Sequence, residues 1–218
     1  MRRFELDHVF FATEDAEGAI RSLRASGLEF DRNGRHPGQG TANSCAILEN
    51  GFVEVLRAAN QEELTSEVVR PLGLDERIRW KETGACPFGL CFRVRGDWAT
   101  LPFSTWEYAA KYLPAGKTIP IVTPARALHE PVVFLSWHEG SRCSPGSPNH
   151  GLKISKADVR LPAGTLSPGL MWCVEHELFG VDAGPRPELR LQLRGDLKRG
   201  QNLEPTPHLP VRIHWRAG

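Results

Sequence analysis

Residues 35–43 read Arg-His-Pro-Gly-Gln-Gly-Thr-Ala-Asn, a turn-rich run between two short segments with the composition of β-strands. The segment before it is residues 28–31, and the one after it is residues 43–48. A further strand is predicted at residues 52–57. Asn50-Gly51 precedes it and favours a tight hairpin, because both residues tolerate positive φ. The run 35–43 therefore connects strands of one small antiparallel unit.

The residues before this unit predict one more strand and one helix. Residues 4–12 are rich in aromatic and β-branched side chains and predict a strand. Thr13 is the expected helix cap, apolar residues then recur at helical spacing, and Gly27 ends the helix. The first sixty residues therefore predict the order strand, helix, strand, strand, strand.

The rest of the chain predicts a looser mixture of short elements. Asn60 and Glu63 are spaced as a capping box, so a helix is expected from there to Pro71. Further strands are predicted at 90–94, 119–122, 132–137, 152–161, 189–193 and 211–215, with helices at 106–113 and ending near 178–180. The fold class is α+β. The expected division is an N-terminal module at 1–58, a connecting helix and middle segment at 59–140, and a C-terminal strand-rich module at 150–218.

Composition excludes several classes of protein. In 218 residues, 27 Lys and Arg balance 26 Asp and Glu, which argues against a nucleic-acid binder or a polybasic membrane anchor. No apolar run approaches the roughly 20 residues of a membrane span, and the N-terminus has no signal-peptide pattern. The five cysteines are scattered without a CxxC pair, so a disulfide framework is not expected. A reduced, cytoplasmic protein is the expectation.

Two polar residues interrupt apolar rows on the predicted strands. Because side chains alternate along a strand, His8 shares a face with Leu6 and Phe10, and Glu54 shares one with Phe52. Burying a carboxylate without a partner costs several kcal/mol, so Glu54 needs a cation, a donor or water. A divalent metal (Zn, Fe, Mn or Ni) held by His8 and Glu54 would meet that need.

Each of these features also has a purely structural interpretation. His8 could be a hydrogen-bonded core residue, and Glu54 could pair with Arg35 or Arg57. The glycines of the run 35–43 could let the backbone approach a ligand, with Arg35 and His36 as its binding groups. Alternatively they serve only the geometry of the turn. Asn43 could orient a ligand or end that turn.

Three stretches together resemble the glyoxalase-like domains of the vicinal oxygen chelate (glyoxalase/bleomycin resistance/dioxygenase) superfamily. They are Leu6-Asp7-His8-Val9, the run of residues 35–43, and Phe52-Val53-Glu54-Val55-Leu56. The resemblance is good over residues 4–58 and weaker over about 86–160. It implies paired βαβββ modules that form a curled mixed sheet lining a cleft.

The same resemblance implies a divalent metal in the cleft. His8 and Glu54 match the family's first-strand histidine and last-strand glutamate. The other ligands would come from the second module, but residues 89–92, at the corresponding strand start, include no histidine. His150 is then the best substitute ligand, and His138 and Glu139 are weaker candidates.

The expected function is a metal-dependent lyase, isomerase or dioxygenase-type enzyme acting on a small oxygenated metabolite. The candidate catalytic residues are Glu54, His36 and Arg35, and the candidate substrate-binding residues are Arg35, His36, Asn43 and Trp137. The alternative is a non-catalytic module that binds or sequesters a small molecule. No nucleotide cofactor is expected, because neither a phosphate loop nor a dinucleotide fingerprint is present. The resemblance also implies a homodimer.

Overall fold

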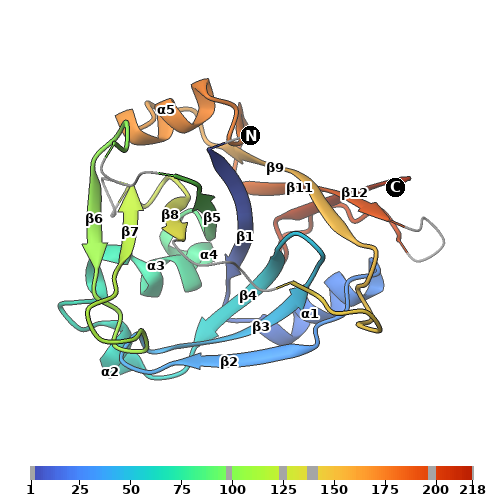
Figure 1. Ribbon diagram of the computed structural model, residues 1–218, viewed down its shortest axis with the longest axis horizontal. Coiled ribbons are helices and arrows are strands. Elements are labelled where there is room, and N and C mark those ends of the chain that lie inside the picture. The colour runs from blue at the N-terminus through green and yellow to red at the C-terminus, as the bar shows by residue number, and fades with distance from the viewer. Residues whose placement is uncertain (1–2, 97–99, 123–126, 137–141, 196–199, 218) are drawn as a thin grey trace.

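The structure is a computed structural model that describes residues 3–96, 100–122, 127–136, 142–195 and 200–217. Its strands form an eight-stranded sheet in the order β2-β3-β4-β1-β5-β8-β7-β6 and a four-stranded sheet in the order β10-β9-β11-β12 (Figure 1). In chain order the strands are β1 (Phe4–Ala12), β2 (Arg32–His36), β3 (Thr41–Ile47), β4 (Phe52–Ala58), β5 (Phe88–Val94), β6 (Thr105–Tyr108), β7 (Ile119–Val122), β8 (Val132–Ser136), β9 (Lys153–Leu161), β10 (Gly180–Ala183), β11 (Glu188–Gly195) and β12 (Val211–Ala217).

The first module has the predicted order β1, α1 (Ala16–Ala25), β2, β3, β4. β1 pairs parallel with β4, and β2, β3 and β4 pair antiparallel. The helix cap is Asp15, not the predicted Thr13, because the Asp15 carboxylate accepts a hydrogen bond from Gly18 N at 2.9 Å. In the hairpin between β3 and β4, a Cβ on Gly51 would lie 2.0 Å from the backbone oxygen of Asp7. Glycine at 51 therefore lets this hairpin approach β1.

The second module repeats the strand arrangement of the first. β5 pairs parallel with β8, β6 and β7 pair antiparallel, and β1 and β5 meet antiparallel at the centre of the sheet. The helix predicted at residues 106–113 is wrong, because Trp106 pairs with Ile121 of β7 within strand β6. Among the described residues between β5 and β6 there is no helix. The paired modules and the curled mixed sheet that the resemblance implied are confirmed.

The curl of the large sheet brings its two ends toward each other. Figure 1 shows β6 and β7 on one side and β2 and β3 on another, with β1 between them. The Tyr112 ring, just after β6, lies 4.8 Å from the His36 ring at the end of β2. The Tyr112 hydroxyl donates to Gln39 Oε1 at 3.3 Å. These contacts link the two ends over the concave face.

Short helices follow the first module: α2 (Gln61–Leu64), the 3-10 turn η1 (Arg70–Leu72), α3 (Leu74–Ile78) and α4 (Trp80–Thr83). The cap at Asn60 is confirmed, since its side chain accepts from Glu63 N at 3.2 Å, but the helix ends at Leu64 instead of Pro71. The Glu63 carboxylate accepts from the backbone N–H groups of Gly38 and Gly40, at 2.7 and 3.1 Å. Both glycines have a φ of 78°, so they serve the turn geometry, and their amides are already bound.

One buried arginine fixes these helices against the sheet. Arg77 is fully buried and donates to the backbone oxygens of Leu72, Cys86 and Glu130. Burial of a guanidinium requires such partners. Within the described ranges, no helix has both the length and the apolar character needed to span a bilayer.

A register shift in β1 puts Asp7 and His8 on the same face of the sheet. Leu6 and His8 pair with consecutive residues of β5, so Asp7 is the extra residue of a β-bulge. Leu6 therefore packs with the core on the convex side, whereas Phe10 belongs to the cluster on the concave side. The predicted grouping of Leu6 with His8 is wrong for this reason.

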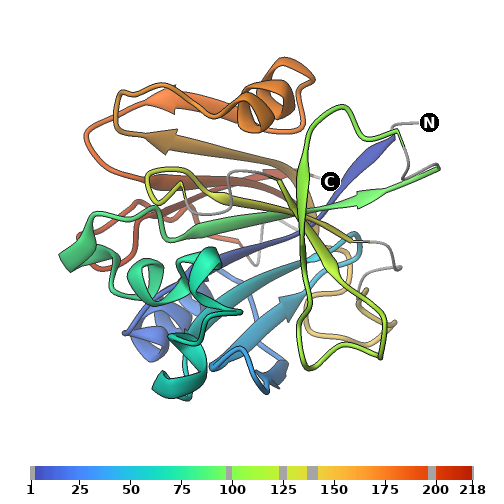
Figure 2. The ribbon, with the colours of Figure 1, turned by 90° about the vertical axis from the view of Figure 1, so that its left-hand side faces the viewer.

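The four-stranded sheet is a second layer on the convex side of the large one. Figure 2 shows its strands and α5 (Pro168–Glu175) gathered on one side of the molecule. Leu191 and Ile213, both fully buried, share a core cluster with Val9 and Leu90 of the large sheet. The concave side is thus left clear of the C-terminal strands.

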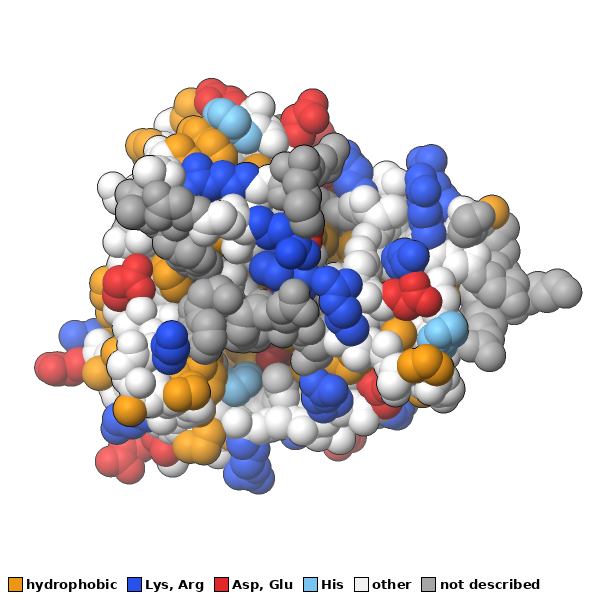
Figure 3. Space-filling model, in the orientation of Figure 1, with side chains coloured by type: hydrophobic (Ala, Val, Ile, Leu, Met, Phe, Trp, Pro, Cys, Tyr) orange, Lys and Arg blue, Asp and Glu red, His pale blue; other side chains and the backbone are white. Residues whose placement is uncertain are grey.

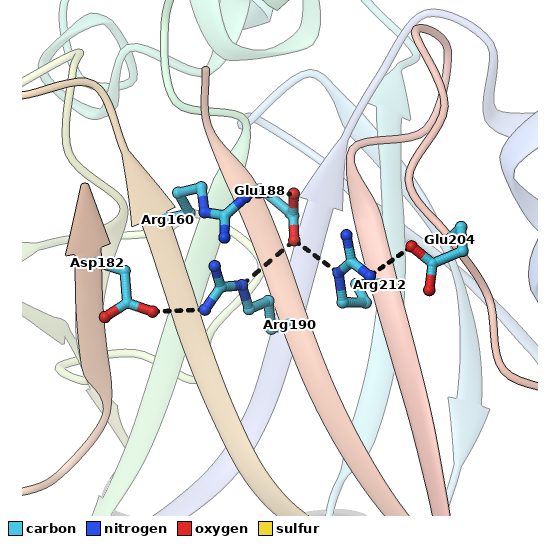
Figure 4. A network of polar contacts seen from close by, with 6 residues as sticks. All are labelled: Arg160, Asp182, Glu188, Arg190, Glu204 and Arg212. Carbon is cyan, nitrogen blue, oxygen red and sulfur yellow. Dashed lines mark hydrogen bonds and ion pairs between the residues drawn. The ribbon is translucent and has the colours of Figure 1, made fainter. Parts of the chain in front are cut away.

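The outer face of the four-stranded sheet carries an ion-pair network around Glu188 (Figure 4). Glu188 is 6 % exposed and accepts from Arg190 at 3.2 Å and from Arg212 at 2.9 Å, with Arg160 at 3.6 Å. Burial alone would raise the pKa of Glu188, but the arginines lower it overall. On the face seen in Figure 3, basic side chains gather near the middle and acidic side chains lie mostly toward the edge, although the net charge of the chain is only +1.

We expect Glu188→Gln to lower the free energy of unfolding by roughly 1–3 kcal/mol at neutral pH, because it leaves arginines without their anion. Since folding lowers the pKa of Glu188, its contribution is present above the ordinary glutamate pKa and is lost as the pH falls through the folded-state value. Urea unfolding over a pH series measures this. Glu204→Gln is the control, because Glu204 also binds Arg212 but is 66 % exposed. Equal losses in the two variants would contradict the expectation.

Candidate functional site

The concave face of the large sheet encloses a cavity of about 310 Å³. Its apolar lining includes Phe10, Phe52, Leu56, Leu72, Leu74, Leu113, Ile119, Ile121, Val132 and Phe134. Its polar lining includes Asp7, His8, Arg32, His36, Gln39, Asn43, Glu54, Cys91, Tyr108 and Tyr112. All described lining residues precede residue 137, so strands β9 to β12 supply none of them. The cavity is a mainly apolar space with a few polar groups, as is usual for small-molecule sites.

His8 is held in one orientation by its neighbours. Its Nδ1 lies 2.7 Å from Asp7 Oδ2, and its ring stacks on Phe52 with the ring centroids 4.0 Å apart. The Phe134 ring lies edge-on to the His8 ring, with the ring centroids 5.1 Å apart. A carboxylate can only accept, so Nδ1 carries a proton, and in the neutral imidazole Nε2 then holds the lone pair. His8 thus offers a positioned proton acceptor among apolar side chains.

Asp7 is itself held by a buried cation. Its side chain is 1 % exposed and forms an ion pair with Arg93, whose side chain is 5 % exposed. Glu5 lies 3.8 Å from the same guanidinium. Burial alone would raise the pKa of Asp7, but the hydrogen bonds from His8 and Arg93 and the charge of Arg93 lower it overall. Asp7 is therefore anionic at neutral pH and fixes the tautomer of His8.

Glu54 lies on β4, beside the strand that carries His8. It is 6 % exposed, and its Oε1 accepts from Asn43 Nδ2 at 2.7 Å. Gly34, opposite Asn43 on β2, makes room for this amide, since a Cβ at 34 would lie 2.6 Å from Asn43 Oδ1. The partner of Glu54 is thus Asn43 instead of the arginines considered from sequence.

His36 belongs to a second polar group, where the two ends of the sheet meet. Its Nδ1 lies 2.9 Å from Thr41 Oγ1, which also accepts from Gln39 Nε2 at 2.7 Å. Burial lowers the pKa of His36 below its ordinary value, against the opposing effect of the Glu54 carboxylate. The His36 imidazole is therefore neutral at pH 7 and can hydrogen bond to an uncharged ligand.

The structure brings together four of the predicted site residues. His8, Glu54, His36 and Asn43 all line the cavity. Arg35 does not, because it is exposed on the opposite face of β2 from His36. His150 lies in an exposed turn and is not among the described lining residues. Trp137, His138 and Glu139 lie outside the described residues.

Sequence reasoning missed several residues that line the cavity. Arg32 does so, because the strand expected at residues 28–31 instead spans Arg32–His36 and puts Arg32 on the same face as His36. Asp7 was assigned to the wrong face, because the bulge has no clear signal in one sequence. Tyr108 and Tyr112 were placed in the helix that the structure replaces with β6 and the turn after it.

Among the described residues, β5 and β8 add no further metal-ligating imidazole or carboxylate to His8 and Glu54 on the concave face. On the concave face β5 presents Gly89, Cys91 and Arg93, and β8 presents Val132, Phe134 and Ser136. None of these six is an imidazole or a carboxylate. A Cβ on Gly89 would lie 2.1 Å from the Phe10 ring, so this ring fills the space of a side chain at 89.

One other cluster of ligand atoms lies in the described part of the chain. Those of Asp7, His8 and Cys91 are within 4.8 Å of one another, a donor set that suits zinc. Asp7 already binds Arg93, however, and burial raises the pKa of the Cys91 thiol well above its ordinary value. An ion there would have to compete with the guanidinium and deprotonate the thiol. Glu54 is not part of this cluster.

Comparison with known proteins gives a family match for the N-terminal part of the chain. Residues 6–101, from β1 to just past β5, match the family described as glyoxalase-like domain. No protein of curated function matches the chain in sequence.

Comparison with solved structures gives one that shares the fold and others with a lower structural similarity. A hypothetical protein from Staphylococcus aureus is 11 % identical and superposes with a TM-score of 0.58, covering 98 % of this chain and 100 % of that one. This likeness extends over the four-stranded sheet. Methylmalonyl-CoA epimerase from Mycobacterium tuberculosis is 16 % identical, with a TM-score of 0.36, and the match covers 60 % of this chain and 85 % of that one. A hypothetical protein from Bacillus halodurans is 12 % identical, with 65 % and 100 % covered and a TM-score of 0.42.

Asp7→Asn is expected to lower the free energy of unfolding by about 3 kcal/mol at neutral pH, because Arg93 stays buried without its anion. Folding lowers the pKa of Asp7, so this contribution is present above the ordinary aspartate pKa and is lost as the pH falls through the folded-state value. Urea unfolding from about pH 7 to about pH 3 measures the difference between variant and wild type.

The control for this prediction is Glu5→Gln, which removes the more exposed carboxylate near the same guanidinium. We expect it to cost no more than about 1 kcal/mol. A loss as large as that of Asp7→Asn, or a loss for Asp7→Asn that does not shrink in acid, would contradict the role given to Asp7.

Proposed function

Residues 6–101 are a glyoxalase-like domain of the vicinal oxygen chelate superfamily, and from this premise we propose that the chain is an enzyme that moves a proton on a small oxygenated molecule. The observation that carries this proposal is His8, whose Nδ1 is bound by the buried Asp7 and whose ring lines an apolar cavity. A base oriented by a carboxylate is a recurrent acid–base arrangement. The reaction class is removal of a proton from carbon next to a carbonyl group, followed by its return.

The chain's own residues supply each part of this chemistry. His8 Nε2 takes the proton, and the bonding pair left on carbon forms the enolate. Asp7 stabilises the imidazolium that results, because it is anionic and within hydrogen-bond distance. His36 and Asn43 bind ligand oxygens, and Arg32 offers positive charge to the developing enolate. Glu54, on the strand beside His8, is the second proton-transfer group of the cavity.

The lining selects the ligand by its size and polarity. A cavity of about 310 Å³ suits a small molecule, and its many aromatic and aliphatic side chains favour an apolar skeleton. The ligand must also place at least one oxygen near the polar side chains of β1 to β4, since buried polar groups need partners. We therefore infer a small, mainly apolar carbonyl compound as substrate. Five free cysteines, four of them buried, support a reducing compartment and hence the cytoplasm.

Isotope exchange tests the proposal directly. We expect wild-type protein to speed exchange of the acetyl protons of 4'-methoxyacetophenone in D2O, followed by proton NMR. His8→Gln should slow the protein-dependent exchange by about 100-fold or more, because it removes the base. His150→Gln is the matched control and should leave the rate unchanged, since His150 lies outside the cavity.

Two other results would point elsewhere. Exchange that is equally fast in His8→Gln contradicts the role of His8. A ligand that raises the melting temperature without any exchange supports the alternative function, a non-catalytic binding module.

The cluster of Asp7, His8 and Cys91 supports a second candidate, a zinc-dependent form of the same activity. A chelator separates the two. Exchange that survives chelation and persists in Cys91→Ser supports the metal-free chemistry. Exchange that is lost on chelation, restored by zinc and absent in Cys91→Ser supports the metal-dependent one.

A further inference from the structure

Two buried polar atoms of cavity-lining residues have no partner in the described part of the chain, Asn43 Oδ1 and the Tyr108 hydroxyl. Tyr108 ends strand β6, lines the cavity and is 2 % exposed. Its hydroxyl has no hydrogen-bond partner among the residues that the structure describes. Leaving a buried hydroxyl unsatisfied is costly, and phenylalanine would pack the same ring without that cost. The hydroxyl therefore fits a partner that enters the cavity.

The surroundings of Tyr108 decide which kind of partner fits. Tyr108 pairs with Ile119 across the hairpin, and its ring lies 5.7 Å from that of Trp106. It belongs to an apolar cluster with Ile121 and Val132. Burial raises the pKa of Tyr108, so the phenol is neutral and has a proton to donate. The complementary group is an uncharged acceptor, such as a carbonyl or ether oxygen.

The charges of the lining argue against an anionic ligand at this point. Arg32 on β2 is the one basic residue among the described lining residues, apart from the histidines. Tyr108 pairs with Ile119 and shares its apolar cluster with Ile121 and Val132, and none of these side chains is charged. A carboxylate or phosphate placed there would be buried without a counter-charge, which costs several kcal/mol.

Tyr108 is also separate from the reacting groups. His8 lies on β1, and β6 is four positions further along the sheet order. Phe134 and Ile121, on the strands between them, line the cavity with apolar surface. A ligand that contacts both His8 and Tyr108 therefore needs an apolar middle part and an oxygen at each end of the molecule.

We propose that the Tyr108 hydroxyl is a specificity-determining donor that binds a second, uncharged oxygen of the substrate, at the opposite end from the group on which His8 acts. The substrate class is then a small neutral molecule with an apolar, ring-sized skeleton, a carbonyl at one end and a carbonyl or ether oxygen at the other. This rests on the proposed function in so far as His8 marks the reacting end.

A pair of matched ketones tests the assignment. 4'-Methoxyacetophenone and 4'-ethylacetophenone differ by an ether oxygen in place of a methylene group. We expect wild-type protein to bind the methoxy compound about fivefold more tightly, by titration followed by NMR. Tyr108→Phe should lose this preference and keep its affinity for the ethyl compound. The melting temperature of Tyr108→Phe without ligand should equal or exceed that of wild type, because an unpaired hydroxyl is removed.

Tyr112→Phe is the control, because the Tyr112 hydroxyl already donates to Gln39. It should melt at a slightly lower temperature and keep the preference for the methoxy compound. The anionic comparator is 4-acetylbenzoate, which should bind wild type more weakly than the methoxy compound does.

Four binding results would overturn the inference. They are an equal preference in wild type and Tyr108→Phe, no preference in wild type, tighter binding of 4-acetylbenzoate, and failure of both neutral ketones to bind. A marked fall in the melting temperature of Tyr108→Phe would also do so, since the hydroxyl would then have a partner within the protein.

The test separates this inference from the proposed function. A Tyr108-dependent preference without proton exchange leaves the donor role intact and contradicts the enzyme. Exchange that depends on His8, with the same preference in Tyr108→Phe and wild type, supports the enzyme and contradicts the donor role.

Discussion

The ion pair between Asp7 and Arg93 is buried where the two modules meet, on the central strands β1 and β5. It exists because a bulge in β1 turns Asp7 toward the concave face, beside His8. Without Arg93, a carboxylate with 1 % exposure would carry an uncompensated charge. Without Asp7, the tautomer of His8 would not be set. The polar chemistry of the cavity therefore depends on a contact that also joins the two modules.

The two modules have diverged in what they present to the cavity. The first contributes His8, His36, Asn43 and Glu54, and the second contributes mainly apolar side chains. Gly89 illustrates the difference, because the Phe10 ring occupies the space of a side chain at that position. The site is consequently one-sided, with a polar wall from β1 to β4 and an apolar wall from β6 to β8. Such a site suits ligands with a mainly apolar body.

Predictions from sequence succeeded where short-range patterns decide the structure. The order of elements in the first module follows from alternation and from the hairpin at Asn50-Gly51, and the cap at Asn60 predicts where the next helix begins. They failed where a distant partner decides. The segment 106–113 has helical spacing in isolation, but Trp106 pairs with Ile121 of β7 and becomes part of a strand. Arg35 and His36 are adjacent in sequence, yet only His36 faces the cavity, because neighbours on a strand point to opposite sides.

The sequence by itself determined the α+β class, the order of the first module and the placement of His8 and Glu54 on strands, but not which face of these strands is turned to the cavity. These depend on residue alternation and turn chemistry, which act over a few residues. Only the tertiary structure decided which groups meet there. It paired Asp7 with Arg93 across 86 positions, kept His150 out of the cavity, and buried the hydroxyl of Tyr108. Bulges, strand register and the curl of a sheet arise from pairing between distant segments, and no local pattern encodes them.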